Sequence, residues 1–160
     1  EFGKRLANPD AVDVAKWDAR LAKIDWDTGD AKAGKAVFTK ANCATCHSGS
    51  QALGPDLVGI TKRFSRADLL TAILQPSKDV SPRYQTKLFE TRDGKVYQGI
   101  VIYDAVDNLM LQTGASVMVR LDGANVVSRA VSMQSLMPAG LLDALSDREI
   151  VDLYAFLRTP

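Results

Sequence analysis

Both cysteines of the 160-residue chain and its single histidine lie within five positions of one another. They occupy the run CATCH, in which two residues separate Cys43 from Cys46 and His47 follows directly. Thiolates and imidazoles are the protein ligands that borderline and soft transition metals prefer. Because the chain gathers all of them in one stretch, the sequence predicts one metal or cofactor site there.

The spacing Cys-x-x-Cys-His is the attachment signature of c-type haem. Two thiols one helical turn apart can form thioethers with the two vinyl groups along one edge of a porphyrin. His47 is then placed under the iron as the proximal ligand.

A thioredoxin-like redox pair normally belongs to a βαβ pattern, whereas a helical pattern precedes this motif. A structural zinc site needs four ligands, and the chain has three Cys and His residues in all. The remaining alternative is a pair of cysteines without a cofactor, and the signature favours haem over all three.

Helical patterns lie on both sides of the motif. The predicted helices cover residues 9–25, 31–41, 64–75 and 146–157. Three of them begin with residues that can cap free backbone N–H groups: Asp30, Ser65 with Asp68, and Ser146 with Glu149. Pro9 and Asp10 suit the first turn of the first helix, and Trp17 is expected to anchor that helix to the rest of the domain.

The pattern changes between the third and fourth helices, where β-branched and aromatic runs alternate with turn signals such as Asp-Gly. Five short antiparallel strands are predicted at about 84–91, 95–103, 109–113, 117–121 and 125–131. In strand count and turns this block resembles a small SH3-like or Sm-like barrel. The predicted fold class is therefore a mainly α domain with an inserted small antiparallel β-sheet or barrel (α+β). Its expected boundaries are 1–28 for an N-terminal extension and 29–160 for the domain, with the insertion at about 82–132.

Beyond the pentapeptide, three segments resemble the cytochrome c superfamily. GDAKAGKAVFTKANCATCH is similar to its N-terminal helix and haem-binding turn, GPDLVGI to the segment after that turn, and LMPAGLLDALSDREIVDLYAFL to its methionine loop and C-terminal helix. More narrowly, GPDLVGITKRFSRADLLTAILQPSKDVSPRYQT, DGKVYQGIV and SLMPAGL resemble a c-type haem domain of large multidomain proteins in planctomycetes and related bacteria. There the domain is often C-terminal to a β-propeller dehydrogenase-like domain or helical repeats.

The resemblance assigns roles to individual residues. It implies that Cys43 and Cys46 anchor one covalent haem c per chain and that His47 is the proximal ligand. The carbonyl of Pro55 is expected to accept a hydrogen bond from the far nitrogen of that histidine, which fixes the ring and tunes its basicity. Two further positions, Gly34 and Tyr154, match the place where the first and last helices of the cytochrome fold cross closely.

The sixth iron ligand has to come from elsewhere, because no second histidine exists. Met137 precedes a proline in the loop before the last helix, which matches the family's Met-Pro ligand motif, and Met133 is the other candidate. Met110 and Met118 fall in predicted strands, where core packing is expected. An open or exchangeable sixth position is the remaining alternative.

Three other side chains are candidates for the haem surroundings. Arg63 could pair with a haem propionate, the alternative being a solvated surface arginine. Tyr84 and Tyr97 could lie near the haem edge, although a place in the core of the strands is the stronger expectation for both.

The expected function is one-electron transfer without catalysis, between a dehydrogenase, possibly on the same polypeptide, and an acceptor cytochrome or oxidase. A haem-based sensor with a labile sixth ligand is the alternative. A peroxidase would need a distal acid–base residue, and the chain has no second histidine to serve as one.

The net charge of +1 implies no pull toward nucleic acid, and no apolar run is long enough to span a membrane. The chain starts without methionine and is expected to be a mature protein or an excised piece. Haem attachment implies a periplasmic or other extracytoplasmic location.

Overall fold

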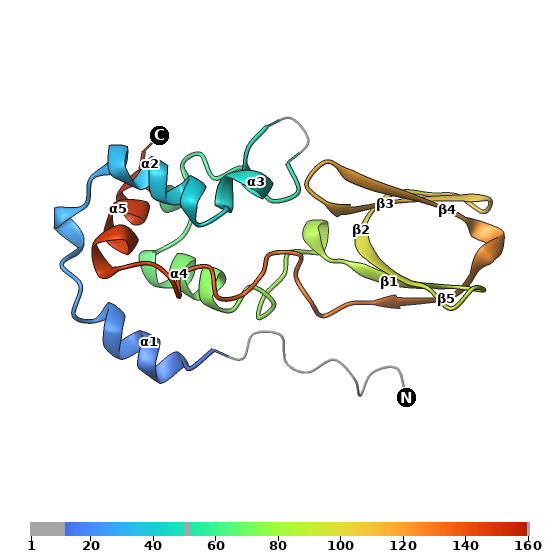
Figure 1. The fold of residues 1–160 in the computed structure, drawn as a ribbon, viewed down its shortest axis with the longest axis horizontal. Coiled ribbons are helices and arrows are strands. Elements are labelled where there is room, and N and C mark those ends of the chain that lie inside the picture. The colour runs from blue at the N-terminus through green and yellow to red at the C-terminus, as the bar shows by residue number, and fades with distance from the viewer. Residues whose placement is uncertain (1–11, 50–51, 160) are drawn as a thin grey trace.

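A computed structural model describes residues 12–49 and 52–159 and shows a helical part at one end of the molecule and a β-sheet at the other (Figure 1). The helices in these ranges are α1 (Val14–Leu21), α2 (Ala31–Lys40), α3 (Cys43–His47), α4 (Arg66–Leu74) and α5 (Asp147–Leu157). The strands are β1 (Lys87–Thr91), β2 (Val96–Asp104), β3 (Asn108–Gly114), β4 (Val117–Asp122) and β5 (Val126–Val131). Short 3₁₀ turns are η2 (Trp26–Thr28), η3 (Ile60–Lys62), η4 (Pro82–Tyr84) and η5 (Gly123–Asn125). The order of elements is the predicted one, with a sheet inserted between helices.

The predicted caps begin three of the helices. The carboxylate of Asp30 accepts from the backbone N–H groups of the first turn of α2. Complete capping boxes begin α4 at Ser65 and α5 at Ser146. The first helix is shorter than predicted, because the side chain of Asp13 caps it and it ends at Leu21. Pro9 and Asp10, which were expected in its first turn, lie outside the described residues.

Helices α2 and α5 cross closely at Gly34. A Cβ atom there would lie 1.9 Å from the backbone oxygen of Asp152 and 2.8 Å from Cβ of Phe156. Phe38, one turn further along α2, also lies against Phe156, with ring centroids 5.2 Å apart. The close approach at Gly34 is therefore as predicted. The expectation that Tyr154 also lies at this crossing is wrong, because its side chain points away from α2.

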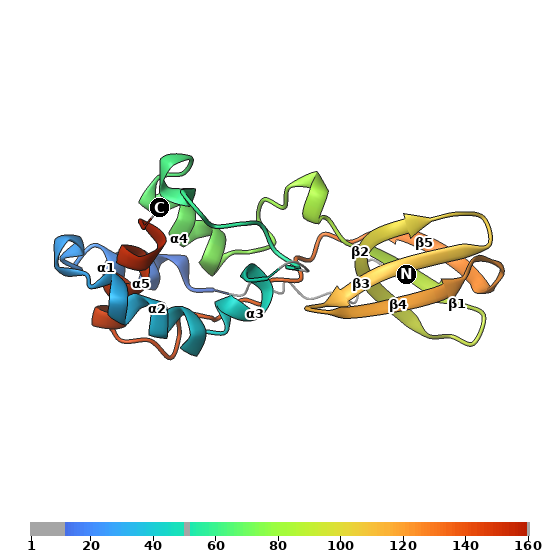
Figure 2. The ribbon, with the colours of Figure 1, turned by 90° about the horizontal axis from the view of Figure 1, so that it is seen from above.

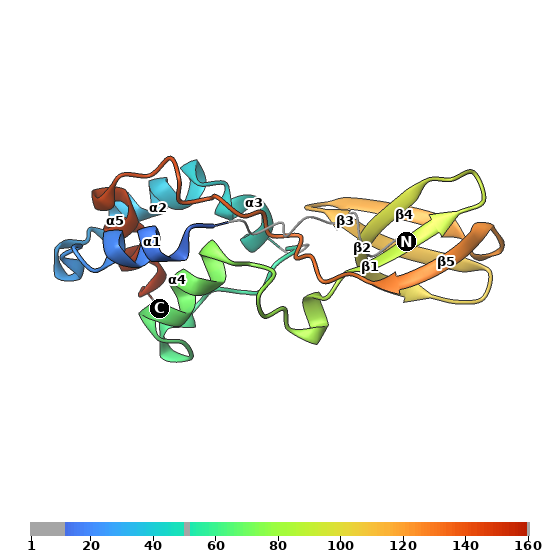
Figure 3. The ribbon, with the colours of Figure 1, turned by 90° about the horizontal axis from the view of Figure 1, so that it is seen from below.

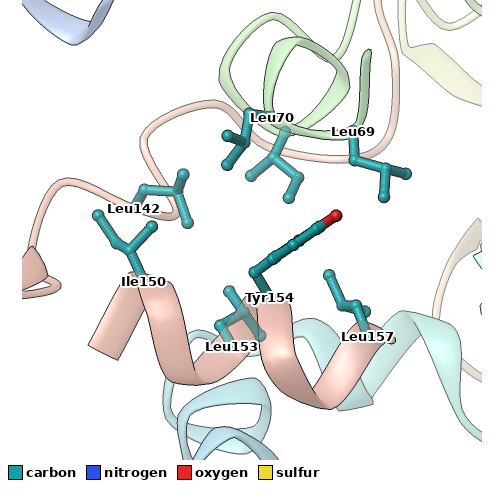
Figure 4. Close-up of a pocket in the computed structure, with 8 residues that line it drawn as sticks. Leu69, Leu70, Leu142, Ile150, Leu153, Tyr154 and Leu157 are labelled. Carbon is teal, nitrogen blue, oxygen red and sulfur yellow. The ribbon is translucent and has the colours of Figure 1, made fainter. Parts of the chain in front are cut away.

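Tyr154 lies on the opposite face of α5, between that helix and α4 (Figure 4). Its ring packs edge-on against Trp26, with centroids 5.6 Å apart. The apolar gap beside it holds only about 10 Å³, which is room for about one water molecule. This gap belongs to the helical core and offers no room for a ligand.

The first helix packs onto the same core. Trp17 is buried in it, as predicted, together with residues of α2, α4 and α5. Arg20 adds polar contacts, because its guanidinium donates to the carboxylate of Asp147 at 2.7 Å and to the Leu145 carbonyl at 2.6 Å. The division of the chain at residues 28 and 29 remains a prediction.

The sheet has the strand order β4-β3-β2-β1-β5, with every pairing antiparallel. Strand β2 serves two pairings: its first half pairs with β1 and its second half with β3. Gly99 lies at this change, where a Cβ atom would be 2.7 Å from the backbone oxygen of Gln112. Tyr97 packs against the core of the sheet, as predicted. Tyr84 was predicted in the first strand but lies in the turn η4 that precedes it.

The helices and the sheet bury separate hydrophobic cores. The sheet core consists of Phe89, Leu109, Leu111 and Leu121, and none of these belongs to the helical core. Views from above and below show that the two parts lie end to end, with α3 as the helix nearest the sheet (Figures 2 and 3). The cysteine–histidine motif therefore lies on the side of the helical part that faces the insertion.

Candidate functional site

The motif forms its own short helix because of the residue before it. Asn42 has the left-handed backbone conformation (φ 63°), which asparagine tolerates better than most residues. It separates α2 from α3 and starts the motif helix afresh. Cys43 and Ala44 then pack against the helical core, which fixes one side of α3.

The two thiols are free and lie three positions apart on α3. Both cysteines are half-buried. Burial raises the pKa of the Cys43 thiol above its ordinary value, and a backbone hydrogen bond opposes this effect only partly. A free thiol there stays protonated at neutral pH. Both thiols occupy one helical turn, as attachment along one porphyrin edge requires.

The ring of His47 is oriented by a backbone carbonyl. Its Nδ1 lies 2.9 Å from the oxygen of Pro55. A carbonyl oxygen can only accept, so Nδ1 carries the proton and the neutral ring keeps its lone pair on Nε2. A carbonyl partner of this kind fixes the tautomer and raises the basicity of a metal-binding histidine. The arrangement leaves Nε2 as the nitrogen available to a metal.

Gly54 allows this carbonyl to come close, and sequence analysis overlooked it. A Cβ atom at Gly54 would lie 2.6 Å from Cε1 and 2.8 Å from Nδ1 of His47. The Gly54 N–H also donates to the Cys46 carbonyl at 2.8 Å. The residue therefore attaches its segment to the end of α3 and leaves room for the imidazole. The signal in the sequence was the glycine immediately before Pro55.

Met137 lies half-buried in the segment between β5 and α5, and its N–H donates to Ser135 Oγ at 3.1 Å. Met133 lies in the same segment but is 78% exposed. Met110 is half-buried in β3. Met118, predicted in the sheet core, is 47% exposed in β4, so that prediction was wrong. The four methionines thus differ clearly in burial.

A cleft of about 790 Å³ lies between the segment around Pro55 and strand β2. Arg63, Arg83 and Tyr84 line it, together with Gly54 and Pro55. Arg63 donates through Nη2 to the backbone oxygen of Asp56 at 3.2 Å. In the described part of the chain, neither arginine forms an ion pair. Both arginines are exposed, and the cleft lining also includes one carboxylate, that of Asp56. The cleft therefore has a surplus of positive charge next to the histidine segment.

The donor set fits a porphyrin better than a bare ion. Within residues 12–49 and 52–159, no three His, Cys, Asp or Glu side chains converge as a metal site. A structural zinc ion would need four ligands. Haem iron already has four nitrogens from the porphyrin and takes only axial ligands from a protein. One oriented imidazole and two thiols on a single turn are what covalent haem requires.

These features fit one class of protein, small helical domains that hold haem through a Cys-x-x-Cys-His motif. The family model described as "Cytochrome C oxidase, cbb3-type, subunit III" matches residues 29–97. The match covers less than half of the chain, and this part is similar to a cytochrome c domain, which supports haem-based electron transfer in general. It includes the motif and Pro55 but ends before Met137. A search of curated proteins gives no match. In the described ranges, no helix is both long and apolar enough to cross a membrane.

Proposed function

We propose that this chain is a mono-haem c-type cytochrome domain that carries single electrons and does no catalysis. The observation that carries the proposal is the hydrogen bond between His47 Nδ1 and the Pro55 carbonyl, which leaves Nε2 free for iron. Cys43 and Cys46 hold haem c through thioethers, each formed when a thiol S–H adds across a vinyl C=C bond. The bound haem supplies an iron that alternates between ferrous and ferric.

Met137 is the proposed sixth ligand. It is half-buried, and the Ser135 hydroxyl fixes its backbone, whereas Met133 projects into solvent. A thioether ligand opposite histidine raises the reduction potential. This pairing suits a reversible one-electron couple.

The spectrum of the purified haem-bound protein tests both assignments. We expect a sulfur-to-iron charge-transfer band at the red edge of the ferric spectrum and no CO binding by the ferrous form. Met137→Ala should abolish the band, and Met133→Ala, the matched control, should retain it. A band that survives Met137→Ala would refute the ligand. Ready CO binding by the unsubstituted protein would favour the sensor function instead.

Arg63 is the proposed partner of a haem carboxylate. It lines the cleft beside Pro55 and forms no ion pair among the described residues. A guanidinium matches the fork of a carboxylate, and its charge is permanent. Arg83 lies on the same cleft, on the side of the insertion.

The biological setting follows from the resemblance. The domain belongs with the c-type haem domains of planctomycete-type multidomain proteins. Its donor is a dehydrogenase, possibly on the same polypeptide, and its acceptor is a cytochrome or an oxidase. Its location is the periplasm or another extracytoplasmic space, where haem is attached. Potential-controlled reduction of the haem by candidate dehydrogenases tests the donor.

A further inference from the structure

A cluster of polar residues lies at the base of the sheet, where the chain enters and leaves the insertion. We call Thr86, Gln98, Ser132 and Gln134 the neck cluster. The Thr86 hydroxyl donates to the Gln134 carbonyl at 2.9 Å. The amide of Gln98 donates to the hydroxyls of Thr86 and Ser132 at 3.0 and 3.2 Å and approaches the Gln134 carbonyl at 3.4 Å. The cluster thus joins strand β2 to the chain that leaves the sheet.

These hydrogen bonds are well shielded from water. Thr86 is 0% exposed and Ser132 is 3% exposed. A buried polar group costs free energy unless it is hydrogen-bonded, so a satisfied buried cluster strongly favours one arrangement. Main-chain pairing already joins β5 to β1, because Lys87 pairs with Val131 and the Ser132 N–H donates to the Thr86 carbonyl. The side chains of Thr86 and Gln98 add hydrogen bonds to the carbonyl of Gln134, which lies beyond the last strand.

Further hydrogen bonds connect this segment with Met137. The N–H of Ser135 donates to Ser77 Oγ at 3.1 Å, which connects the segment to the chain after α4. The Ser135 hydroxyl in turn accepts from the Met137 N–H at 3.1 Å. Only two residues separate Gln134 from Met137. The insertion and the helical part therefore hold the methionine segment from two sides.

We infer that Thr86 and Gln98 are positioning residues for Met137, so that the insertion stabilises the axial methionine. This inference rests on the proposed function, in which Met137 binds the iron. A methionine leaves the iron when its segment opens locally, and bonds that are lost on opening make opening rarer. The neck cluster should therefore protect the sixth position against competing ligands.

The test measures how fast imidazole replaces methionine on the ferric haem. Thr86→Val keeps the shape of the side chain and removes the donor to Gln134, and Gln98→Met removes the amide at similar length. Thr91→Val is the matched control, since Thr91 is also a buried threonine of the sheet and donates to a backbone carbonyl, that of Lys95, at 3.1 Å. Each hydrogen bond lost should raise the rate of replacement about threefold to tenfold.

We expect faster imidazole binding in Thr86→Val and Gln98→Met, with the sulfur-to-iron band still present before imidazole is added. Thr91→Val should keep the rate of the unsubstituted protein even if its thermal stability falls. Unchanged rates in both neck variants, or an equal increase in the control, would overturn the inference and leave the ligand assignment standing. A missing band in the unsubstituted protein would overturn the ligand assignment itself. If Thr86→Val fails to fold, Gln98→Met decides the matter.

Discussion

The His47 ring occupies a space between two backbone groups of the segment that follows α3. One is the Pro55 carbonyl, which accepts the Nδ1 proton, and the other is the Gly54 backbone, whose missing side chain makes room for the ring. The orientation and basicity of His47, the proposed proximal ligand, thus depend on the path of the main chain. At the scale of single residues, Gly54 is therefore as important for the site as the residues proposed to bind haem.

Gly54→Ala is expected to displace either the imidazole or the Pro55 segment. The added Cβ would lie within 2.6 Å of Cε1 of His47, closer than unbonded atoms approach. Overpacking of this kind costs about 1–3 kcal/mol. We expect a lower unfolding midpoint in denaturant. In the Met137→Ala background, where the ferrous haem is five-coordinate, we also expect a weaker iron–histidine stretch in the resonance Raman spectrum.

Gly114→Ala is the matched control for that substitution. A Cβ atom at Gly114 would meet Val117 at 3.5 Å, an ordinary van der Waals distance. This variant should leave the iron–histidine stretch unchanged. A Gly54→Ala protein with the stretch and midpoint of the unsubstituted protein would show that the loop yields without disturbing the ligand.

At the scale of elements, the crossing of α2 and α5 holds the helical part together. Gly34→Ala would place a methyl group 1.9 Å from the Asp152 carbonyl oxygen and force the helices apart. Alanine improves helix propensity by about 1 kcal/mol, but the clash should outweigh this gain and leave a net loss of roughly 1–3 kcal/mol. Denaturant unfolding measures it. Lys35→Ala, at an exposed neighbouring position of α2, should change stability little, and a stabilised Gly34→Ala variant would contradict the packing.

Glu149 connects the same two helices through charge. The Lys40 ammonium and the capping contacts of Ser146 lower the pKa of Glu149 from 4.5 to about 2. Because the folded protein holds this proton less tightly than the unfolded chain, the contribution to stability is complete above about pH 4.5. It is lost as the pH falls toward about 2.

Glu149→Gln should therefore lower the melting temperature at neutral pH and make its decline in acid shallower. Thermal unfolding from neutral pH down to about pH 2 measures both effects. Asp79→Asn replaces an exposed carboxylate that forms no ion pair among the described residues, and it should keep the acid slope. Parallel curves for Glu149→Gln and the unsubstituted protein would rule out this linkage.

The helices and strands also show which parts of the fold can be predicted from the sequence. The capping boxes at Ser65 and Ser146 are local patterns, so the starts of α4 and α5 were predictable. Tyr84 was misplaced because an aromatic residue next to a strand resembles a strand residue until the turn η4 intervenes. The bond from Thr86 to Gln134 joins positions 48 residues apart and leaves no periodic trace. Distant contacts of this kind require the structure. The close approach of α5 at Gly34 was predicted, but its contact with Asp152 was not.

At the scale of the whole molecule, two separately packed parts meet beside the Cys-x-x-Cys-His motif. Each contributes to the cleft: the helical part supplies Arg63, and the approach to the insertion supplies Arg83 and Tyr84. A cation near the iron favours the ferrous state, because ferric haem carries one more positive charge. Under the proposed function, the placement of the two parts sets how strongly these arginines act on the reduction potential.

Removing either cleft arginine should lower the reduction potential. For Arg63→Gln and Arg83→Gln we expect a decrease on the order of tens of millivolts at low salt, shrinking as salt screens the charge. Lys62→Gln is the matched control, because Lys62 is an exposed cation next to Arg63 that does not line the cleft. Spectroelectrochemical titration measures all three variants. If Arg63→Gln lowers the potential no more than Lys62→Gln, Arg63 is a solvated surface residue and the haem carboxylates lie elsewhere. If Arg83→Gln alone matches the control, the helical part sets the potential without help from the insertion.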